Sequence, residues 1–80
     1  MEREKHPEIA LAIQIVGKQA VLAQKIGCAQ QTVSKMLNRS GPVSAENALR
    51  IDRATGGLVP KWRLRPDLWQ PATVAEMSQS

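Results

Sequence analysis

The 80-residue sequence is poor in the residues that hold many small domains together. It contains one cysteine, Cys28, and one histidine, His6, so it offers neither a disulfide pair nor the ligand spacing of a zinc site. It has no phenylalanine or tyrosine, and its aromatic residues are Trp62 and Trp69. A chain this short buries a modest share of its surface on folding. We therefore expect one domain with a core of packed aliphatic side chains, alone or extended by a partner subunit.

Long apolar runs and catalytic groupings are also missing. No run approaches the roughly 20 residues of a membrane span, and the first residues, MEREKH, lack the hydrophobic stretch of a secretory signal. There is no catalytic combination of His, Cys, Ser and acidic residues, and no glycine-rich phosphate loop. We expect a cytoplasmic protein that is not an enzyme, uses no cofactor or metal, and binds no membrane or small-molecule substrate.

Positive charge is concentrated in the middle of the chain. The formal net charge is +4, and between residues 17 and 65 nine lysines and arginines are opposed only by Glu46 and Asp52. A compact basic segment attracts polyanions, of which nucleic acid is the usual example. Because a basic solvated face is also common on small domains that bind nothing anionic, charge alone leaves both interpretations open.

Hydrophobic residues at helical spacing predict an all-α fold of four to five helices. The first helix begins at Pro7 and ends by Gly17. Its apolar stripe is broad enough to be covered on more than one side: Ile9, Leu11, Ala12, Ile13, Ile15 and Val16. A later helix starts after the N-cap Ser44, pairs Glu46 with Arg50, and ends at two glycines. Its inward residues are expected to be Ala48, Leu49, Ile51 and Ala54.

The segment LVPKWRLRPDLW, residues 58–69, allows two predictions. Pro60 and Pro66 exclude one continuous helix, so the segment forms either a short fifth helix or an irregular strand. Trp62 and Trp69 either cap the core or anchor a dimer interface.

These patterns divide the chain into three predicted parts. Residues 1–6 are expected to be an N-terminal tail, and residues 7–69 a single domain. Residues 70–80 are mostly polar, so we expect a disordered C-terminal tail there.

Residues 19–38, QAVLAQKIGCAQQTVSKMLN, fit the frame of a helix-turn-helix. Two helices that touch closely need a small residue at the contact, here Ala23, and the sharp turn needs a residue with positive φ, here Gly27. Five further positions are apolar and seal the motif against the core, with Cys28 as a small hydrophobe: Leu22, Ile26, Cys28, Val33 and Met36. The second helix of such a motif enters the major groove of DNA. A helical hairpin that binds no nucleic acid is the alternative.

One side of the helix after Gly27 is entirely polar. We expect base contacts from the start of this helix and from the next turn, namely Gln30, Gln31, Ser34 and Lys35. A glutamine amide can pair bidentately with adenine, and a lysine can contact guanine or a phosphate. Contacts with the DNA backbone are expected from Lys18, Gln19, Thr32, Asn38 and Arg39. A merely solvated polar face is the simpler alternative for each of them.

The frame resembles the phage repressors of the Cro and CI type. The segment ENALRIDRATGGLVPKWRLRPDLW resembles more specifically the YdaS-like group of small Cro-like regulators, in which a charged helix ends in ATGG and is followed by LRPD and an aromatic residue. The resemblance covers residues 9–69. It implies a compact lambda-repressor-like domain, encoded in a phage or prophage, that binds a palindromic DNA operator as a homodimer. Some members are antitoxins paired with a toxin protein, which is the alternative function.

Two residues depart from the pattern of these relatives. Ala29 stands where serine or threonine often precedes the recognition helix, and Met36 where a tryptophan often packs. Without a cap from Ala29 or from the glutamines after it, we expect DNA to complete the first turn of that helix. Resemblance to the phage repressors also implies that Gln19 holds a phosphate and braces Gln30.

Overall fold

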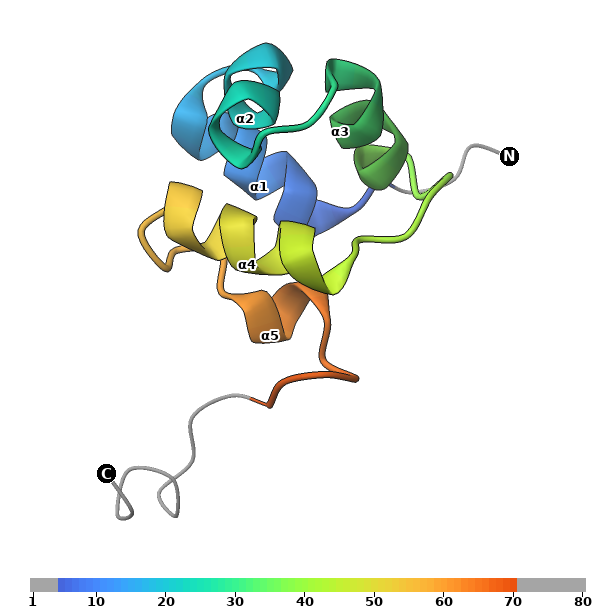
Figure 1. Ribbon diagram of the computed structural model, residues 1–80, viewed down its shortest axis with the longest axis vertical. Helices are drawn as coiled ribbons and strands as arrows, with labels where there is room; N and C mark the ends of the chain where they lie inside the picture. The colour runs from blue at the N-terminus through green and yellow to red at the C-terminus, as the bar shows by residue number, and fades with distance from the viewer. Residues whose placement is uncertain (1–4, 71–80) are drawn as a thin grey trace.

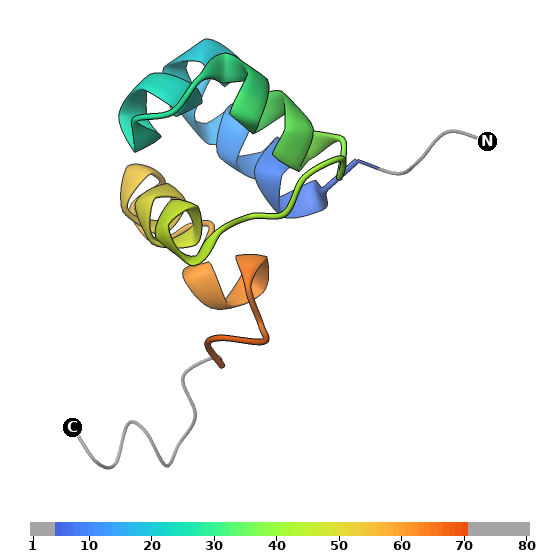
Figure 2. The same ribbon diagram turned by 45° about the vertical axis from the view of Figure 1, so that its right-hand side comes forward.

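The structure, a computed structural model, describes residues 5–70, which form five helices and no strand. In chain order they are α1 (Pro7–Val16), α2 (Gln19–Ile26), α3 (Gln30–Leu37), α4 (Ala45–Ala54) and α5 (Lys61–Leu64). The pair α2 and α3 packs against α1, while α4 contacts α2 and α5 (Figure 1). The view turned by 45° shows α4 and α5 together on the side of the molecule away from α3 (Figure 2). The predicted all-α fold is confirmed, and residues 61–64 form the short fifth helix.

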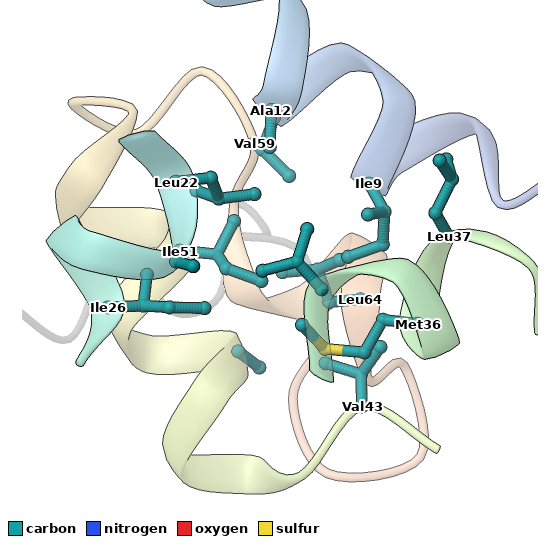
Figure 3. Packing of buried hydrophobic residues seen from close by; sticks show 13 residues of the cluster. Ile9, Ala12, Leu22, Ile26, Met36, Leu37, Val43, Ile51, Val59 and Leu64 are labelled. Carbon is teal, nitrogen blue, oxygen red and sulfur yellow. The ribbon is translucent and has the colours of Figure 1, made fainter. Parts of the chain in front are cut away.

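The core is a single cluster of aliphatic side chains to which all five helices contribute (Figure 3). Ile9, Leu22 and Ile51 come from three different helices and are fully buried. Full burial of such a side chain stabilises a fold by about 1.5–3 kcal/mol. Cys28 and Trp69 are partly buried and pack against the same cluster, whose members are Ile9, Ala12, Leu22, Ala23, Ile26, Val33, Met36, Leu37, Val43, Ala48, Ile51, Val59 and Leu64.

Two side chains expected in the core lie at the surface instead. Ile15 and Leu49 are each 37% exposed. Ile15 lies in the last turn of α1, just before the chain bends by 92° into α2, and its predicted burial is wrong. The rest of the broad apolar stripe is covered, since α1 contacts both α2 and α3, and its partly buried residues pack against the core: Leu11, Ile13 and Val16. Leu49 follows the buried Ala48, and one residue turns a helix by about 100°, which carries its side chain off the inner face.

The ATGG segment fixes α5 against α4 through a buried threonine. Thr55 is 3% exposed, and its hydroxyl donates to the carbonyl of Ile51 at 2.9 Å and accepts from the backbone N–H of Val59 at 3.1 Å. The backbone N–H of Lys61, at the start of α5, donates to Oδ2 of Asp52 at 2.9 Å. The bonds from the N–H groups of Val59 and Lys61 join the end of α4 to the segment that leads into α5, so they set the path of this segment.

The structure describes both ends of the predicted domain and only the adjoining residues of the two predicted tails. His6, which the sequence analysis placed in the N-terminal tail, donates its backbone N–H to the carbonyl of Leu37 at 2.8 Å and so joins the end of α3. Residues 1–4 and 71–80 of the predicted tails lie outside the described residues.

Within residues 5–70, no single helix is both long and apolar enough to cross a membrane. The helices α1 and α2 meet that criterion only as a pair, across the 92° bend between them. Ile9, Ala12, Leu22, Ala23 and Ile26, the buried residues of this pair, belong to the common core.

Candidate nucleic-acid interface

The turn between α2 and α3 has the geometry that the helix-turn-helix frame requires. Gly27 adopts a left-handed conformation with φ of 72°. Its N–H donates to the carbonyl of Gln24 at 3.3 Å, and the N–H of Cys28 donates to the carbonyl of Ala23 at 3.0 Å, the pairing of a Schellman helix end. Ala23 is 4% exposed and belongs to the core, as expected for the small residue of the frame. The sequence therefore placed both helices and the turn correctly.

Helix α3 presents one apolar face to the core and one polar face to solvent. Its buried residues are Val33, Met36 and Leu37. On the opposite side, the side chains of Gln30, Gln31 and Lys35 are exposed and that of Ser34 is half-buried. The structure thus places all four predicted base-contacting residues on the accessible part of a single helix.

The first turn of α3 has no side-chain cap. Ala29 occupies the N-cap position in an extended conformation, and no side chain of the described residues accepts a hydrogen bond there. The N–H of Thr32 donates to the carbonyl of Ala29 at 3.0 Å. The N–H groups before it, at the very start of the helix, have no partner within the helix, so they point outward as donors with a partial positive charge. An anion or a DNA phosphate would satisfy them.

The residues predicted to contact the DNA backbone differ in how far their side chains are exposed to solvent. Lys18, the N-cap of α2, is exposed, whereas Gln19 and Thr32 are half-buried. Asn38 is exposed and its amide donates to Oγ of Ser34 at 3.4 Å, which links two members of the polar face. None of the hydrogen bonds among the described residues joins Gln19 to Gln30, so the brace implied by the resemblance is absent from this structure.

Arg39 ends α3 in a conformation that usually belongs to glycine. Its φ is 59°, and it is the sole non-glycine residue with positive φ in the described chain. Its N–H donates to the carbonyl of Met36 at 3.2 Å, and that of Ser40 to the carbonyl of Lys35 at 2.9 Å. This is the same Schellman pairing that Gly27 makes after α2. An arginine in this place costs backbone energy that a glycine would avoid, and its side chain is exposed beside the polar face.

Two arginines of the basic segment turn inward to backbone carbonyls, which the sequence analysis did not predict. Arg50 donates from Nη1 to the carbonyl of Ile26 at 2.9 Å. Arg65 donates from Nη1 to the carbonyl of Val43 at 2.9 Å. No feature of the local sequence could reveal these contacts, because their partners lie 24 and 22 residues away along the chain.

Two further cations lie over the tryptophan rings. Nζ of Lys61 is 5.5 Å from the ring centre of Trp69, and Cζ of Arg63 is 5.3 Å from that of Trp62. Trp69 also packs against the core, and Trp62 is half-buried. The basic segment therefore offers fewer uncommitted cations than its composition suggests, and those with exposed side chains include Lys18, Lys25, Lys35 and Arg53.

A surface hollow of about 490 Å³ lies where the C-terminal end of α2 meets α4. Three cationic side chains line it, from Lys25, Arg50 and Arg53, together with Gln24, Ile26 and Gly27. Arg50 also forms an ion pair with Glu46, as the sequence predicted. The surface beside the turn is therefore electropositive.

Burial shifts the pKa values of two side chains near the helix-turn-helix, His6 and Cys28. Burial and the positive charge of Arg39 lower the pKa of His6, while Glu8 acts in the opposite direction. Nδ1 of His6 and Oε2 of Glu8 are buried and have no hydrogen-bond partner among the described residues. Burial raises the pKa of the Cys28 thiol despite the nearby Arg50, which suits its packing role.

Fold and surface together define a small all-helical domain built around a helix-turn-helix. A family model described as "Bacterial toxin YdaS" matches residues 9–72, which is most of the chain. The chain belongs to this family. No curated protein and no solved structure matches it significantly.

Proposed function

We propose that this protein is a sequence-specific DNA-binding regulator of transcription, a Cro-like repressor of phage or prophage origin. The observation that carries the proposal is the first turn of α3, which has no side-chain cap and bears Gln30 and Gln31 with exposed side chains. Glutamines add nothing to the helix as caps at these positions. They do suit a helix whose N-terminal end is inserted into the major groove, where their amides meet base edges.

The remaining polar residues fit the same orientation. Ser34 and Lys35 lie one turn further along α3 and can reach the next bases. Lys18 and Arg39 stand at the start of α2 and the end of α3, so they can hold phosphates on either side of the groove. Bound over a promoter, the protein would exclude RNA polymerase and so repress transcription.

The proposal includes a homodimer on a palindromic operator. Two copies of α3 would enter successive major grooves about 34 Å apart. Trp69 and its neighbour Leu68, which is 47% exposed, supply an apolar surface on which two subunits could meet. Sedimentation of the protein with and without an operator duplex would show whether the dimer forms before or upon DNA binding.

The direct test is binding to a duplex selected from a random-sequence library. Affinity for the selected duplex should exceed that for a scrambled one and should fall steeply with added salt, because phosphate contacts release counterions. In a base-substitution series, Gln31→Ala should relax the preference at one base pair, a change of about 1–3 kcal/mol in discrimination. Gln14→Ala, which changes an exposed glutamine of α1, is the matched control. Binding that is weak, unselective and insensitive to salt would refute the proposal.

A role in a toxin–antitoxin pair is the second candidate. The sequence resemblance suggested the antitoxin of such a pair, whereas the description of the family favours the toxin. The two candidates are compatible if harm to the cell arises from DNA occupancy. Expression of the wild-type chain in bacteria should then slow growth, and the double variant Gln30→Ala with Gln31→Ala should relieve that effect at equal protein level. Unchanged growth inhibition by the double variant would point to a protein partner as the target.

A further inference from the structure

The segment that carries α3 is held at both of its ends by an arginine from elsewhere in the chain. On the N-terminal side, Arg50 of α4 donates to the carbonyl of Ile26, the last residue of α2. On the C-terminal side, Arg65 donates to the carbonyl of Val43, in the loop that leads from α3 to α4. The two hydrogen bonds, each 2.9 Å long, enclose the turn, α3 and the loop.

Each arginine is itself oriented by a carboxylate. Arg50 forms an ion pair with Glu46, one turn earlier on the same helix. Arg65 makes a bidentate contact with Asp67: its Nε donates to Oδ1 at 2.9 Å, and its Nη2 donates to Oδ2 at 2.7 Å. A guanidinium has enough donors to bind a carboxylate and a carbonyl at once in fixed geometry. The acidic partner therefore selects the rotamer from which the carbonyl is reached.

These contacts join the residues that flank α3 to α4 and to the residue after α5. Helix α3 packs mainly on α1 and α2, whereas α4 packs on α2 and α5. The side chain of Arg50 comes from α4, and Arg65 directly follows α5. Directional hydrogen bonds therefore tie the residues on either side of α3 to α4 and to the end of α5, in addition to apolar packing.

We propose that Arg50 and Arg65 are positioning residues that set the orientation of α3 for DNA recognition and do not themselves contact DNA. The proposal rests on the function proposed above. It assigns the LRPD segment a task within this chain, because Arg65 and Asp67 of that segment hold the loop after α3. A small error in the orientation of a recognition helix moves its side chains away from the base edges and reduces sequence selectivity first.

The test uses substitutions that preserve charge. Arg50→Lys and Arg65→Lys retain the cation, but a lysine ammonium cannot reproduce the planar contact with carboxylate and carbonyl together. Arg53→Lys is the matched control, since Arg53 is an exposed residue of the same helix α4. Each variant is assayed below its melting temperature for affinity to the selected duplex and to a scrambled duplex, over a series of salt concentrations.

The expected result is a several-fold loss of the ratio between the two affinities for Arg50→Lys and Arg65→Lys, with an unchanged salt dependence. The control should match the wild type. A lower melting temperature with an unchanged ratio of the affinities for the selected and scrambled duplexes would show that the two arginines have only a general structural role. A salt slope lower by about one in Arg50→Gln or Arg65→Gln would make that residue a phosphate contact, and either outcome overturns the proposal.

A measurement without DNA separates this inference from the proposed function. Amide hydrogen exchange in the free protein should accelerate in α3 and residues 38–43 of Arg65→Lys, and near residues 27–29 of Arg50→Lys, but not in Arg53→Lys. If the wild type shows no sequence preference, the proposed function fails, while hydrogen exchange still tests whether Arg50 and Arg65 hold the residues around α3. If exchange is unchanged in both variants, this positioning role of the two arginines is refuted.

Discussion

The hydroxyl of Thr55 accepts a hydrogen bond from the backbone N–H of Val59 at 3.1 Å and donates one to the carbonyl of Ile51 at 2.9 Å. Since Thr55 is 3% exposed, water cannot replace these contacts without opening the core. Thr55→Val keeps the shape of the side chain but leaves the Val59 N–H without its partner. We expect a loss of about 1–3 kcal/mol in the free energy of unfolding, measured by urea denaturation.

The matched control for this prediction is Thr55→Ser, which keeps the hydroxyl and removes a methyl group. It should be more stable than Thr55→Val. A Thr55→Val variant as stable as the wild type would show that the hydroxyl contributes nothing and that packing alone matters.

Gly27 tests the geometry of the turn. Its φ of 72° is unfavourable for any residue with a Cβ atom, and an added Cβ would meet Nη1 of Arg50 at 3.5 Å, an ordinary contact distance. The backbone conformation therefore dominates, and Gly27→Ala should lower the free energy of unfolding by about 1–2 kcal/mol. Gly41→Ala also places a Cβ 3.5 Å from its neighbour, Cβ of Lys35, but without positive φ. Thermal unfolding should show a clearly smaller effect for Gly41→Ala, and similar losses for both would contradict this explanation.

Arg39 combines an unfavourable backbone with a proposed phosphate contact, so two variants separate its roles. Arg39→Ala and Arg39→Gly both remove the guanidinium, but only glycine accepts a φ of 59° without strain. We expect Arg39→Gly to be more stable than Arg39→Ala by about 1 kcal/mol in urea denaturation. Both should lose affinity for all DNA sequences alike, with a salt slope lower by about one.

A DNA affinity of Arg39→Gly equal to that of the wild type would exclude the phosphate contact. Equal stability of the two variants would mean that the left-handed conformation is not retained by alanine, which hydrogen exchange at Ser40 and Gly41 would reveal.

His6 should make the stability of the protein depend on pH. Burial and Arg39 lower the pKa of its imidazole in the folded protein below the ordinary value of 6.5. The unfolded chain then binds a proton more readily than the folded one, so the contribution of neutral His6 to stability is present above pH 6.5 and is lost as the pH falls through the folded pKa. Between about pH 7.5 and about pH 5.5 the wild type should lose more unfolding free energy than His6→Gln. Parallel profiles for the two proteins would contradict the assignment.

The sequence predicted local structure well because the cues for it are local. Pro7 begins α1, Gly27 closes α2, and Ser44 caps α4 by accepting from the N–H of Asn47 at 3.1 Å. It overstated burial at Ile15 and Leu49, because an apolar residue near a helical stripe is buried only where another element covers it. The residue type alone does not tell which side is covered.

The candidate site divides in the same way. The exposed positions of Gln30, Gln31 and Lys35 follow from the helical period and were correctly expected. The engagement of Arg50 and Arg65 was missed, because counting charges cannot separate a cation that faces solvent from one bound to a carbonyl more than twenty residues away.

By itself, the sequence determined the helices, the turn at Gly27 and the polar face of α3, because periodicity, capping and backbone freedom act over a few residues. Only the tertiary structure decided that Thr55 joins α4 to the path into α5 and that arginines hold both ends of the segment carrying α3. It also decided that Arg39 takes the left-handed place where the ends of α2 and α4 have glycine. Such contacts arise when distant segments pack together, so no local stretch of the sequence predicts their geometry.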